Sequence, residues 1–307
     1  MTAIKLALTM DVEPLPPEML GCFKDRDAPL AEVSTFLDLT ERYNIPVTYF
    51  ITHDYWDKID FRFPHLVQRM SEIGEIGCHT HFRDNRIYRT DHGFQRMLIE
   101  SATDALRSQG FDVRSFRGGA WFFNRDTLRV LEELNYSTDS SIKPGHYAKP
   151  AHGLVIDHRR ATSLTPYFPS KNNPCLPGNS SVLEVPPTVY PILRFKTKTI
   201  TCCLGLPIDF GSVLCNPSLA LLKFQRMLLK IPRMIIAIPF HSYSLLRFRL
   251  SDVERFFKIA NSMNLEFYTL SDLRKVTVLT SEEPTRTRFA FCRFPEYFAW
   301  IYNRIIL

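Results

Sequence analysis

The chain of 307 residues is 45% apolar and 13% aromatic, which is enough to bury the core of one large domain and excludes a disordered protein. Lys and Arg outnumber Asp and Glu by 38 to 32, a net charge of +6. This mild excess comes with no dense basic run and no recognition-helix or aromatic RNA-binding signature. We therefore expect a solvated surface and no nucleic-acid partner.

The cysteine content indicates a reducing compartment. The seven Cys are odd in number and lack CxxC spacing, so their thiols are expected to be free. The N-terminal apolar run has no small-residue cleavage site, which favours a strand over a signal peptide. The apolar stretch 219–240 is interrupted by Lys, Arg and Pro and is not expected to span a membrane. We expect a cytoplasmic protein, with peripheral membrane contact left open.

Short apolar segments alternate along the chain with amphipathic ones, which is typical of a parallel sheet with crossover helices. Expected strands are 4–10, 47–52, 75–79, 115–119, 234–240 and 265–270. Expected helices are 30–43, 64–73, 92–109, 125–134, 217–230 and 251–262. Asn124 and Ser251 are expected to cap two of them. Polar residues gather just past the strand ends, where α/β barrels and open parallel sheets build their sites.

Residues 143–216 break this rhythm because they hold many of the 21 Pro residues. We expect a long insertion with irregular or short antiparallel structure that overhangs the site. Residues 281–307 form a basic aromatic C-terminal tail. Packing on the domain, joining a partner and lying on a membrane surface stay open for this tail. The expected organisation is one domain over 1–280 followed by the tail.

Two carboxylates follow the first expected strand. Asp11 and Glu13 are two residues apart, so on a continuing strand both face the same way, about 7 Å apart. One can bind a metal while the other serves as a base. The alternative is that this acidic pair caps a helix or pairs with surface Lys.

His79 and His81 show the same spacing at the end of another strand. Neutral imidazoles are the commonest ligands for zinc and its neighbours. Two His and one carboxylate leave a coordination position open for water, as a catalytic rather than a structural zinc requires. A lone His would more often be an ordinary residue, but a pair on one strand face favours the metal site.

Three further residues carry candidate roles. Arg117 ends the strand 115–119 and can hold a carboxylate ionised and aimed, the alternative being an ordinary salt bridge. His241 follows seven apolar residues and emerges at the end of a buried strand, a position that suits a proton donor. Asp139 is a candidate for the acid that tunes His241, or else a turn residue.

Seven segments together resemble a known family. They are LTMDVEP, NIPVTYFIT, EIGCHTHFRD, SFRGGAW, NYSTDSSI, PFHSYSL and FYTLSDL, in this order over residues 4–273. They look like the NodB-homology polysaccharide deacetylases of carbohydrate esterase family 4, in a divergent branch with DVE and HTH motifs. The resemblance implies a distorted (β/α)7-type barrel and a divalent metal, usually Zn²⁺. It also implies hydrolytic removal of an acetyl group from an N-acetylated sugar of a cell-surface glycan or its precursor.

The resemblance assigns catalytic roles residue by residue. The family's catalytic base matches Asp11, its positioning Arg matches Arg117, and its acid matches His241. The Asp of its fourth motif corresponds to Asp139. In this reading, Asp11 takes a proton from the attacking water and His241 protonates the leaving amine.

The metal motifs are where this chain departs from the family pattern. The usual metal-binding Asp falls on Val12, which cannot bind a metal, so Glu13 is the substitute. The second His of the family motif falls on Arg83, so His81 must replace it. The implied ligand set is therefore Glu13 with His79 and His81.

Two surroundings of the site follow from the same resemblance. Backbone N–H groups near Gly118 and Gly119 would hold the oxyanion. Residues of the insertion such as Tyr167 would either contact the sugar or be ordinary loop residues.

Other functions stay open at this point. Val12 and Arg83 at two ligand positions favour a non-catalytic glycan- or partner-binding protein on a degenerate barrel. Related barrels also hydrolyse other C–N amide bonds. The joint presence of Asp11, Arg117 and His241 favours the hydrolase.

Overall fold

The computed structural model describes residues 4–15, 28–52, 65–84, 87–149, 154–161, 163–196, 201–230, 235–263 and 265–276. Within them, one curved sheet has the strand order β10-β7-β6-β3-β2-β1-β13, and β14 also pairs with β1. All these pairings are parallel. The strands are β1 (Lys5–Val12), β2 (Val47–Thr52), β3 (Glu75–Thr80), β6 (Ser115–Gly118), β7 (Thr138–Asp139), β10 (Leu183–Glu184), β13 (Ile236–His241) and β14 (Glu266–Phe267).

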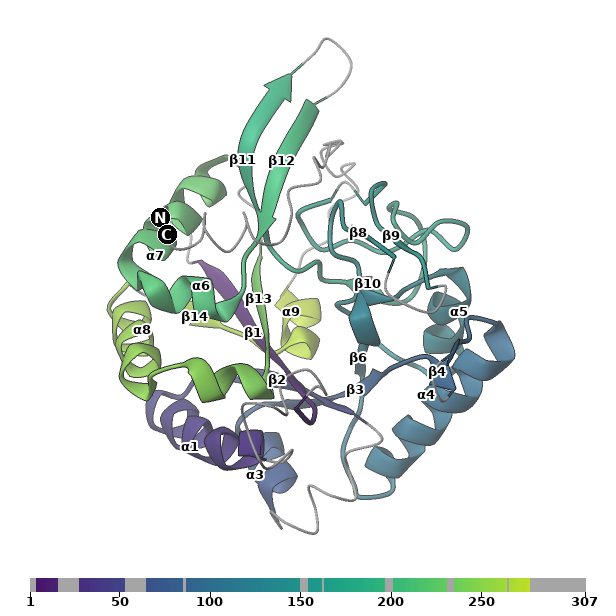
Figure 1. The fold of residues 1–307 in the computed structure, drawn as a ribbon, viewed down its shortest axis with the longest axis horizontal. Helices are drawn as coiled ribbons and strands as arrows, with labels where there is room; N and C mark the ends of the chain where they lie inside the picture. The colour runs from purple at the N-terminus through teal and green to yellow at the C-terminus, as the bar shows by residue number, and fades with distance from the viewer. Residues whose placement is uncertain are drawn as a thin grey trace.

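Helices surround the curved sheet (Figure 1). They are α1 (Ala28–Tyr43), α3 (Leu66–Ile73), α4 (His92–Arg107), α5 (Arg125–Glu133), α6 (Phe210–Cys215), α7 (Pro217–Lys230), α8 (Leu250–Ser262) and α9 (Leu270–Val276). A parallel sheet with helices on its outside is the distorted barrel expected from the sequence, and this fold class is confirmed. Among the described residues, no helix is long and apolar enough to cross a membrane.

Strand β1 shows why the sheet is buried on both faces. Leu6, Leu8, Met10 and Val12 belong to the cluster that packs with the helices. Ala7 belongs instead to a second cluster, which includes Phe50, Leu183, Ala237 and Leu270 from other strands and α9. Because side chains alternate along a strand, Thr9 and Asp11 share the inner face with Ala7.

The helix boundaries follow local capping chemistry. Asn124 accepts a hydrogen bond from the Thr127 backbone N–H at 2.8 Å and begins α5, as expected. The expected cap at Ser251 is wrong, because α8 begins at Leu250 and its N-cap is Arg249. The expected strand 265–270 is also too long, since it shortens to β14 where α9 begins at Leu270.

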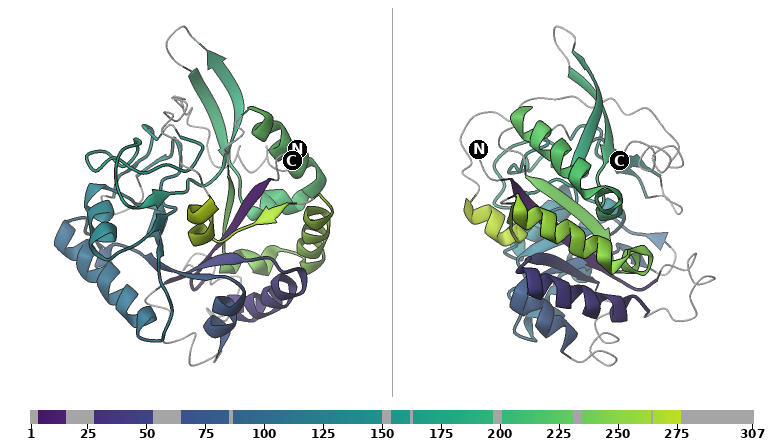
Figure 2. Two further views of the ribbon diagram at one scale, coloured as in Figure 1. Left: turned by 180° about the vertical axis from the view of Figure 1, so that it is seen from behind. Right: turned by 90° about the vertical axis from the view of Figure 1, so that its left-hand side faces the viewer.

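The Pro-rich insertion contains antiparallel structure, as expected. Two short strands, β8 (Tyr147–Ala148) and β9 (Ile156–Asp157), pair with each other. A longer hairpin of β11 (Val189–Lys196) and β12 (Thr201–Pro207) extends away from the sheet (Figure 2). The insertion also supplies β10 to the barrel. The sequence did not predict this strand, because it is only two residues long and is flanked by irregular chain. The tail 281–307 lies outside the described residues.

A polar network at the amino ends of the strands ties α9 to the barrel. The carboxylate of Glu75, the first residue of β3, accepts hydrogen bonds from Thr48 Oγ1 at 3.0 Å and from Ser271 N at 3.1 Å. It also accepts from the hydroxyls of Ser115 and Ser271. Thr48 Oγ1 in turn accepts from Leu270 N at 3.0 Å. One carboxylate therefore joins β2, β3 and β6 to the start of α9.

Replacing Glu75 by Gln is expected to destabilise the fold. The amide keeps the shape of the side chain but replaces one acceptor by a donor, which then faces the donors of Thr48 and Ser271. Losing hydrogen bonds to a charged group costs about 2–3 kcal/mol. Urea unfolding followed by circular dichroism measures this free energy.

The matched control is Glu72→Gln. Glu72 is exposed and accepts a long hydrogen bond of 3.5 Å from Gln68, so the free energy of unfolding of this variant should stay within about 0.5 kcal/mol of the wild-type value. Equal free energies of unfolding for the two variants would contradict the role of Glu75.

Candidate active site

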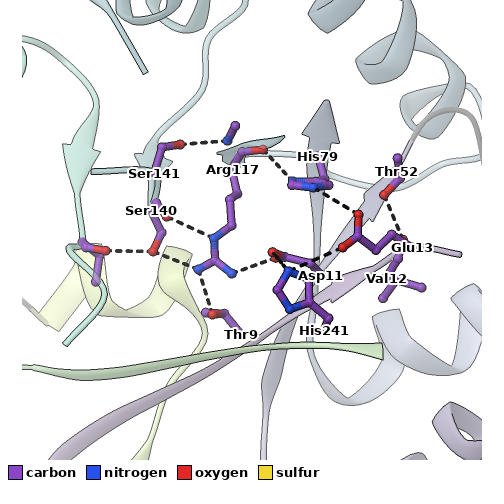
Figure 3. Close-up of polar contacts among 12 residues, drawn as sticks. Thr9, Asp11, Val12, Glu13, Thr52, His79, Arg117, Ser140, Ser141 and His241 are labelled. Atoms are coloured by element: carbon purple, nitrogen blue, oxygen red, sulfur yellow. Dashed lines mark hydrogen bonds and ion pairs between the residues drawn. The ribbon is translucent and has the colours of Figure 1, made fainter. Parts of the chain in front are cut away.

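A buried ion pair links two strands that are not neighbours. Arg117 on β6 donates from Nη1 to Asp11 Oδ1 at 2.7 Å, and the two side chains are 1% and 5% exposed. The same guanidinium donates to Thr9 Oγ1 at 2.8 Å and to the carbonyl and hydroxyl oxygens of Ser140, both at 3.0 Å (Figure 3). With these partners the guanidinium can hold Asp11 in a single orientation.

The surroundings of Asp11 keep it ionised. Burial by itself would raise the pKa of Asp11, but the charge of Arg117, the proximity of the His79 and His241 rings and the hydrogen bond from Arg117 outweigh it. The net pKa lies below the ordinary value. Asp11 is therefore a carboxylate at neutral pH.

Glu13, His79 and His81 converge. The Oε2 atom of Glu13 lies 3.2 Å from His81 Nε2 and 3.9 Å from His79 Nε2. One ligand atom from each residue lies within 4.8 Å of the others. Ligand distances of 2.0–2.2 Å place neighbouring donors of a tetrahedral zinc about 3.3–3.6 Å apart. The donor types therefore fit a small divalent metal. The Glu13–His81 separation is close to this spacing, and the Glu13–His79 separation is wider.

The hydrogen bond of His79 Nδ1 determines which ring nitrogen of this His can bind a metal. Nδ1 lies 2.9 Å from the Arg117 carbonyl oxygen, an acceptor, so Nδ1 carries the proton and Nε2 presents its lone pair toward Glu13. Burial lowers the pKa of His79, which favours the neutral ring that metal binding needs. The strand that carries the positioning Arg117 thereby also orients this His.

The backbone of Glu13 is held in place by Ser242. The Glu13 N–H donates to Ser242 Oγ at 3.1 Å, and that hydroxyl donates to the Glu13 carbonyl oxygen at 2.8 Å. Thr52 Oγ1 secures the preceding peptide through the Val12 carbonyl oxygen at 3.1 Å. Sequence reasoning missed Ser242, although its place directly after His241 at a strand end was an available signal.

Neither Val12 nor Arg83 belongs to this cluster. Val12 is completely buried in the cluster that packs with the helices. Arg83 is exposed on the short strand β4 (Arg83–Asp84), where it pairs with Tyr88 of β5 (Ile87–Tyr88). Because strand alternation turns Val12 outward, Glu13 occupies the inner position, and His81 meets it there.

His241 faces both carboxylates. Its Nε2 lies 3.5 Å from Glu13 Oε1 and 3.8 Å from Asp11 Oδ2. Its ring stacks on Tyr243 with centroids 4.6 Å apart and an interplanar angle of 14°. His241 therefore lies near Oδ2 of Asp11, whereas Arg117 donates to Oδ1.

Asp139 has different partners from those expected. It accepts from Ser141 Oγ at 2.6 Å and from Ser141 N at 3.1 Å. Burial raises the pKa of Asp139, and burial with the negative charge of Asp139 raises that of Glu184 well above its ordinary range. Glu184 Oε1 accepts a hydrogen bond from the Ile142 N–H at 3.1 Å. The carboxylates beside His241 are those of Asp11 and Glu13, whereas the partners of Asp139 are Ser141 and, through its charge, Arg117.

Gly118 and Gly119 serve close packing. The Gly118 N–H already donates to Ser141 Oγ at 2.8 Å, so it is not available to an oxyanion in this conformation. At Gly119, an added Cβ would overlap the imidazole of His81, so this glycine makes room for a metal-site residue. Tyr167 is 3% exposed and donates to the Pro174 carbonyl oxygen at 3.0 Å, which supports its interpretation as an ordinary residue of the insertion.

Comparison with known proteins agrees with this geometry. Residues 5–138 match the family model described as polysaccharide deacetylase. They include Asp11, Glu13, His79, His81 and Arg117 but end before Asp139 and His241. A search of curated proteins finds no significant match.

Several solved structures are similar in fold. A putative polysaccharide deacetylase from Mycobacterium smegmatis has a TM-score of 0.56 at 19% identity, covering 92% of this chain and 95% of that chain. A 4-alpha-glucanotransferase from Thermococcus litoralis has a TM-score of 0.59 at 11% identity, covering 94% and 42%. Puue allantoinase has a TM-score of 0.55 at 15% identity, covering 89% of each chain. At these identities the likeness shows the barrel fold, and the family match over residues 5–138 supports a polysaccharide-deacetylase domain on that barrel.

Proposed function

We propose that this protein is a metal-dependent hydrolase that removes the acetyl group from an N-acetylated sugar of a cell-surface glycan or its precursor. One observation carries the proposal. Three groups meet at the carboxyl ends of β1, β3, β6 and β13. They are the Asp11 carboxylate held by Arg117, the His241 imidazole, and the three possible metal ligands Glu13, His79 and His81. The family match over residues 5–138 supports the same reaction class.

Glu13, His79 and His81 would hold the metal, and their two imidazoles and one carboxylate suit zinc. When bound, a divalent metal supplies Lewis acidity and lowers the pKa of water. Three protein ligands leave a position open, as a hydrolytic site needs.

Asp11 is the proposed general base. Its Oδ1 is engaged by Arg117, so Oδ2 is the oxygen that would accept the proton of the attacking water. Its lowered pKa means that it is always ionised at neutral pH, at the cost of being a weak base. The hydrogen bonds of Arg117 to Thr9 and Ser140 fix the direction from which Asp11 acts.

His241 is the proposed general acid. Its Nε2 lies within 3.8 Å of both Asp11 and Glu13, so it lies next to the position where a leaving nitrogen would depart. The stacked ring of Tyr243 limits its rotation. Protonation of the leaving amine by His241 completes the hydrolysis.

A second candidate is a non-catalytic glycan-binding protein. The observation in its favour is that Val12, a buried apolar residue, and Arg83, an exposed one, stand at two ligand positions of the family and lie outside the donor cluster. Glu13 and His81 occupy the site in their place, which favours the hydrolase. Metal content and acetate release separate the two functions.

The metal set predicts a stoichiometric site. Purified protein loaded with Zn²⁺ and desalted is expected to retain about one ion per chain, measured by elemental analysis. The double variant His79→Ala, His81→Ala should lose it, because a single carboxylate does not hold zinc. His92→Ala, in which the changed residue lies near Glu133, is the control and should retain it. Equal metal in all three proteins would refute the ligand set.

Gly119→Ala tests the close packing against His81. The new methyl group would displace the His81 ring, so zinc affinity should fall about 10–100-fold, as when a supporting residue of a metal site is lost. Competition with a chromophoric chelator measures the affinity, and circular dichroism checks the fold.

The control for this variant is Gly93→Ala. There the nearest atom to an added Cβ is Asp91 Oδ1 at 3.7 Å, so zinc affinity should be unchanged. If Gly119→Ala binds zinc as tightly as the wild type, His81 is not held against position 119 in the loaded protein.

Acetate release from a panel of N-acetylated sugars tests the reaction. Asp11→Asn should lower kcat about 10²–10⁴-fold, because the amide cannot accept a proton, while zinc content is retained. Asp38→Asn, at an exposed ion pair with Arg69, is the control. A chelator should abolish activity and added zinc should restore it. Bound zinc with no acetate released from any sugar would favour the binding protein or a hydrolase of another amide.

A further inference from the structure

The hairpin of β11 and β12 stands apart from the barrel. Its two strands form a sheet of their own, and in the part of the chain that the structure describes no other strand pairs with them and no helix packs along them (Figure 1 and Figure 2). An isolated two-stranded hairpin is marginally stable in water and gains stability when a further surface packs against it. We therefore expect this hairpin to have a partner.

The register of the hairpin divides its residues between an apolar and a basic face. Residues opposite each other in an antiparallel pair share a face, and the face alternates from one pair to the next. The register skips Ile192 of β11 but no residue of β12. Counted along β12, one face holds the pairs Tyr190–Leu206, Leu193–Leu204 and Phe195–Cys202. The opposite face holds Val189–Pro207, Pro191–Gly205, Arg194–Cys203 and Lys196–Thr201. The hairpin is therefore amphipathic.

The positive charge of the chain is concentrated in the same segment. Residues 189–233 contain seven Lys or Arg and one acid, so their net charge equals the +6 of the whole chain. That acid, Asp209, caps α6 by accepting a hydrogen bond from the Ser212 N–H at 2.7 Å. The segment includes α7, which lies at the same end of the molecule as the hairpin (Figure 1 and Figure 2). Leu222 and Arg226 are exposed on α7 one helical turn apart.

Charge and polarity together decide between the possible partners of the apolar face. A second copy of this chain would bring the same positive segment against it, and residues 281–307 are also net positive. Nucleic acids and acidic glycans complement the charge but offer no apolar phase to a face of Tyr, Leu and Phe. A membrane surface that carries anionic lipids offers both.

We propose that the β11–β12 hairpin, together with α7, docks this protein on a membrane surface that contains anionic phospholipids. The hairpin lies in the plane of the interface, where its apolar face enters the boundary between headgroups and acyl chains. The basic face stays at the level of the lipid phosphates, which the cations of the segment attract. Docking needs neither a metal nor a sugar, so the proposal stands or falls independently of the proposed hydrolysis.

Vesicle sedimentation with the full chain tests the docking. Vesicles of phosphatidylcholine alone are compared with vesicles that also contain phosphatidylglycerol. The protein should bind the anionic vesicles at least about tenfold more tightly, and added salt should weaken this binding because it screens the lipid charge. Equal binding to both kinds of vesicle, or binding to neither, overturns the proposal.

Leu204→Asn and Cys203→Asn compare the two faces at neighbouring positions of β12. Leu204→Asn places an amide on the apolar face and should weaken binding to the anionic vesicles about tenfold. Cys203→Asn makes the same kind of change on the opposite face and should alter binding less than about twofold. Circular dichroism checks that both variants fold. If Leu204→Asn binds like the wild type, or both variants lose binding equally, the hairpin face is not the docking surface.

The double variant Arg194→Gln, Lys196→Gln tests the basic face. It should bind the anionic vesicles about 20-fold more weakly, since each basic residue near such a surface contributes about fivefold. Lys258→Gln is the control, because Lys258 is an exposed residue of α8 that pairs with Glu254 at 3.1 Å. An equal effect of the two changes would mean that the attraction is not specific to the hairpin and would contradict the proposal.

Two further measurements test the other partners. Analytical ultracentrifugation of the wild type and of Leu204→Asn reports self-association. A dimer that Leu204→Asn dissociates, with no binding to vesicles, would assign the apolar face to a second copy and overturn membrane docking. Binding of duplex DNA that is tighter than binding of the anionic vesicles would overturn it as well.

Discussion

The buried pair of Arg117 and Asp11 is the interaction on which the site depends. In the sheet order, β6 and β1 are separated by β3 and β2, so this ion pair crosses the inner face of the curved sheet. A buried charge whose partner is removed costs about 3–5 kcal/mol. The hydrogen bonds from Arg117 to Thr9 and Ser140 offset the desolvation of the guanidinium. The peptide carbonyl of Arg117 also accepts from His79. One residue therefore links the proposed base to the proposed metal site.

Strand register explains how two unusual motifs can form one site. Val12 of β1 pairs with Ile51 of β2, and Ile51 pairs with Cys78 of β3. Glu13 follows Val12 and His79 follows Cys78, so these two residues lie at the same level on the inner face. Because side chains alternate, a spacing of two places the second member of each pair on that face as well. Glu13 and His81, each the second member of its pair, therefore meet at this level.

The sequence predicted a large part of the fold because its strands are continuous apolar runs. The runs at 47–52 and 75–79 correspond to β2 and β3, and the six expected helices lie within two residues of α1, α3, α4, α5, α7 and α8. The helices α6 and α9 were not expected. It did not predict β10, because a two-residue strand carries no periodicity and is recognised only by its pairing with β7. The neighbour of Asp139 across the sheet was missed for the same reason, since Glu184 lies on β10 and is in register with Asp139. Burial and the charge of Asp139 raise the pKa of Glu184. Ser242 and Gly119 also act through contacts with residues distant in the chain.

The sequence by itself determined which side chains reach the carboxyl ends of the strands. Spacing within a strand decides its faces, so Asp11 with Glu13 and His79 with His81 were each expected to point one way. Only the tertiary structure decided that the two faces are the same inner face, and that His241 joins them while Asp139 is bound by Ser141. The physical reason is that alternation is a local property of the chain. Convergence depends on strand order, sheet curvature and the burial of charge, which arise from contacts between segments far apart in sequence.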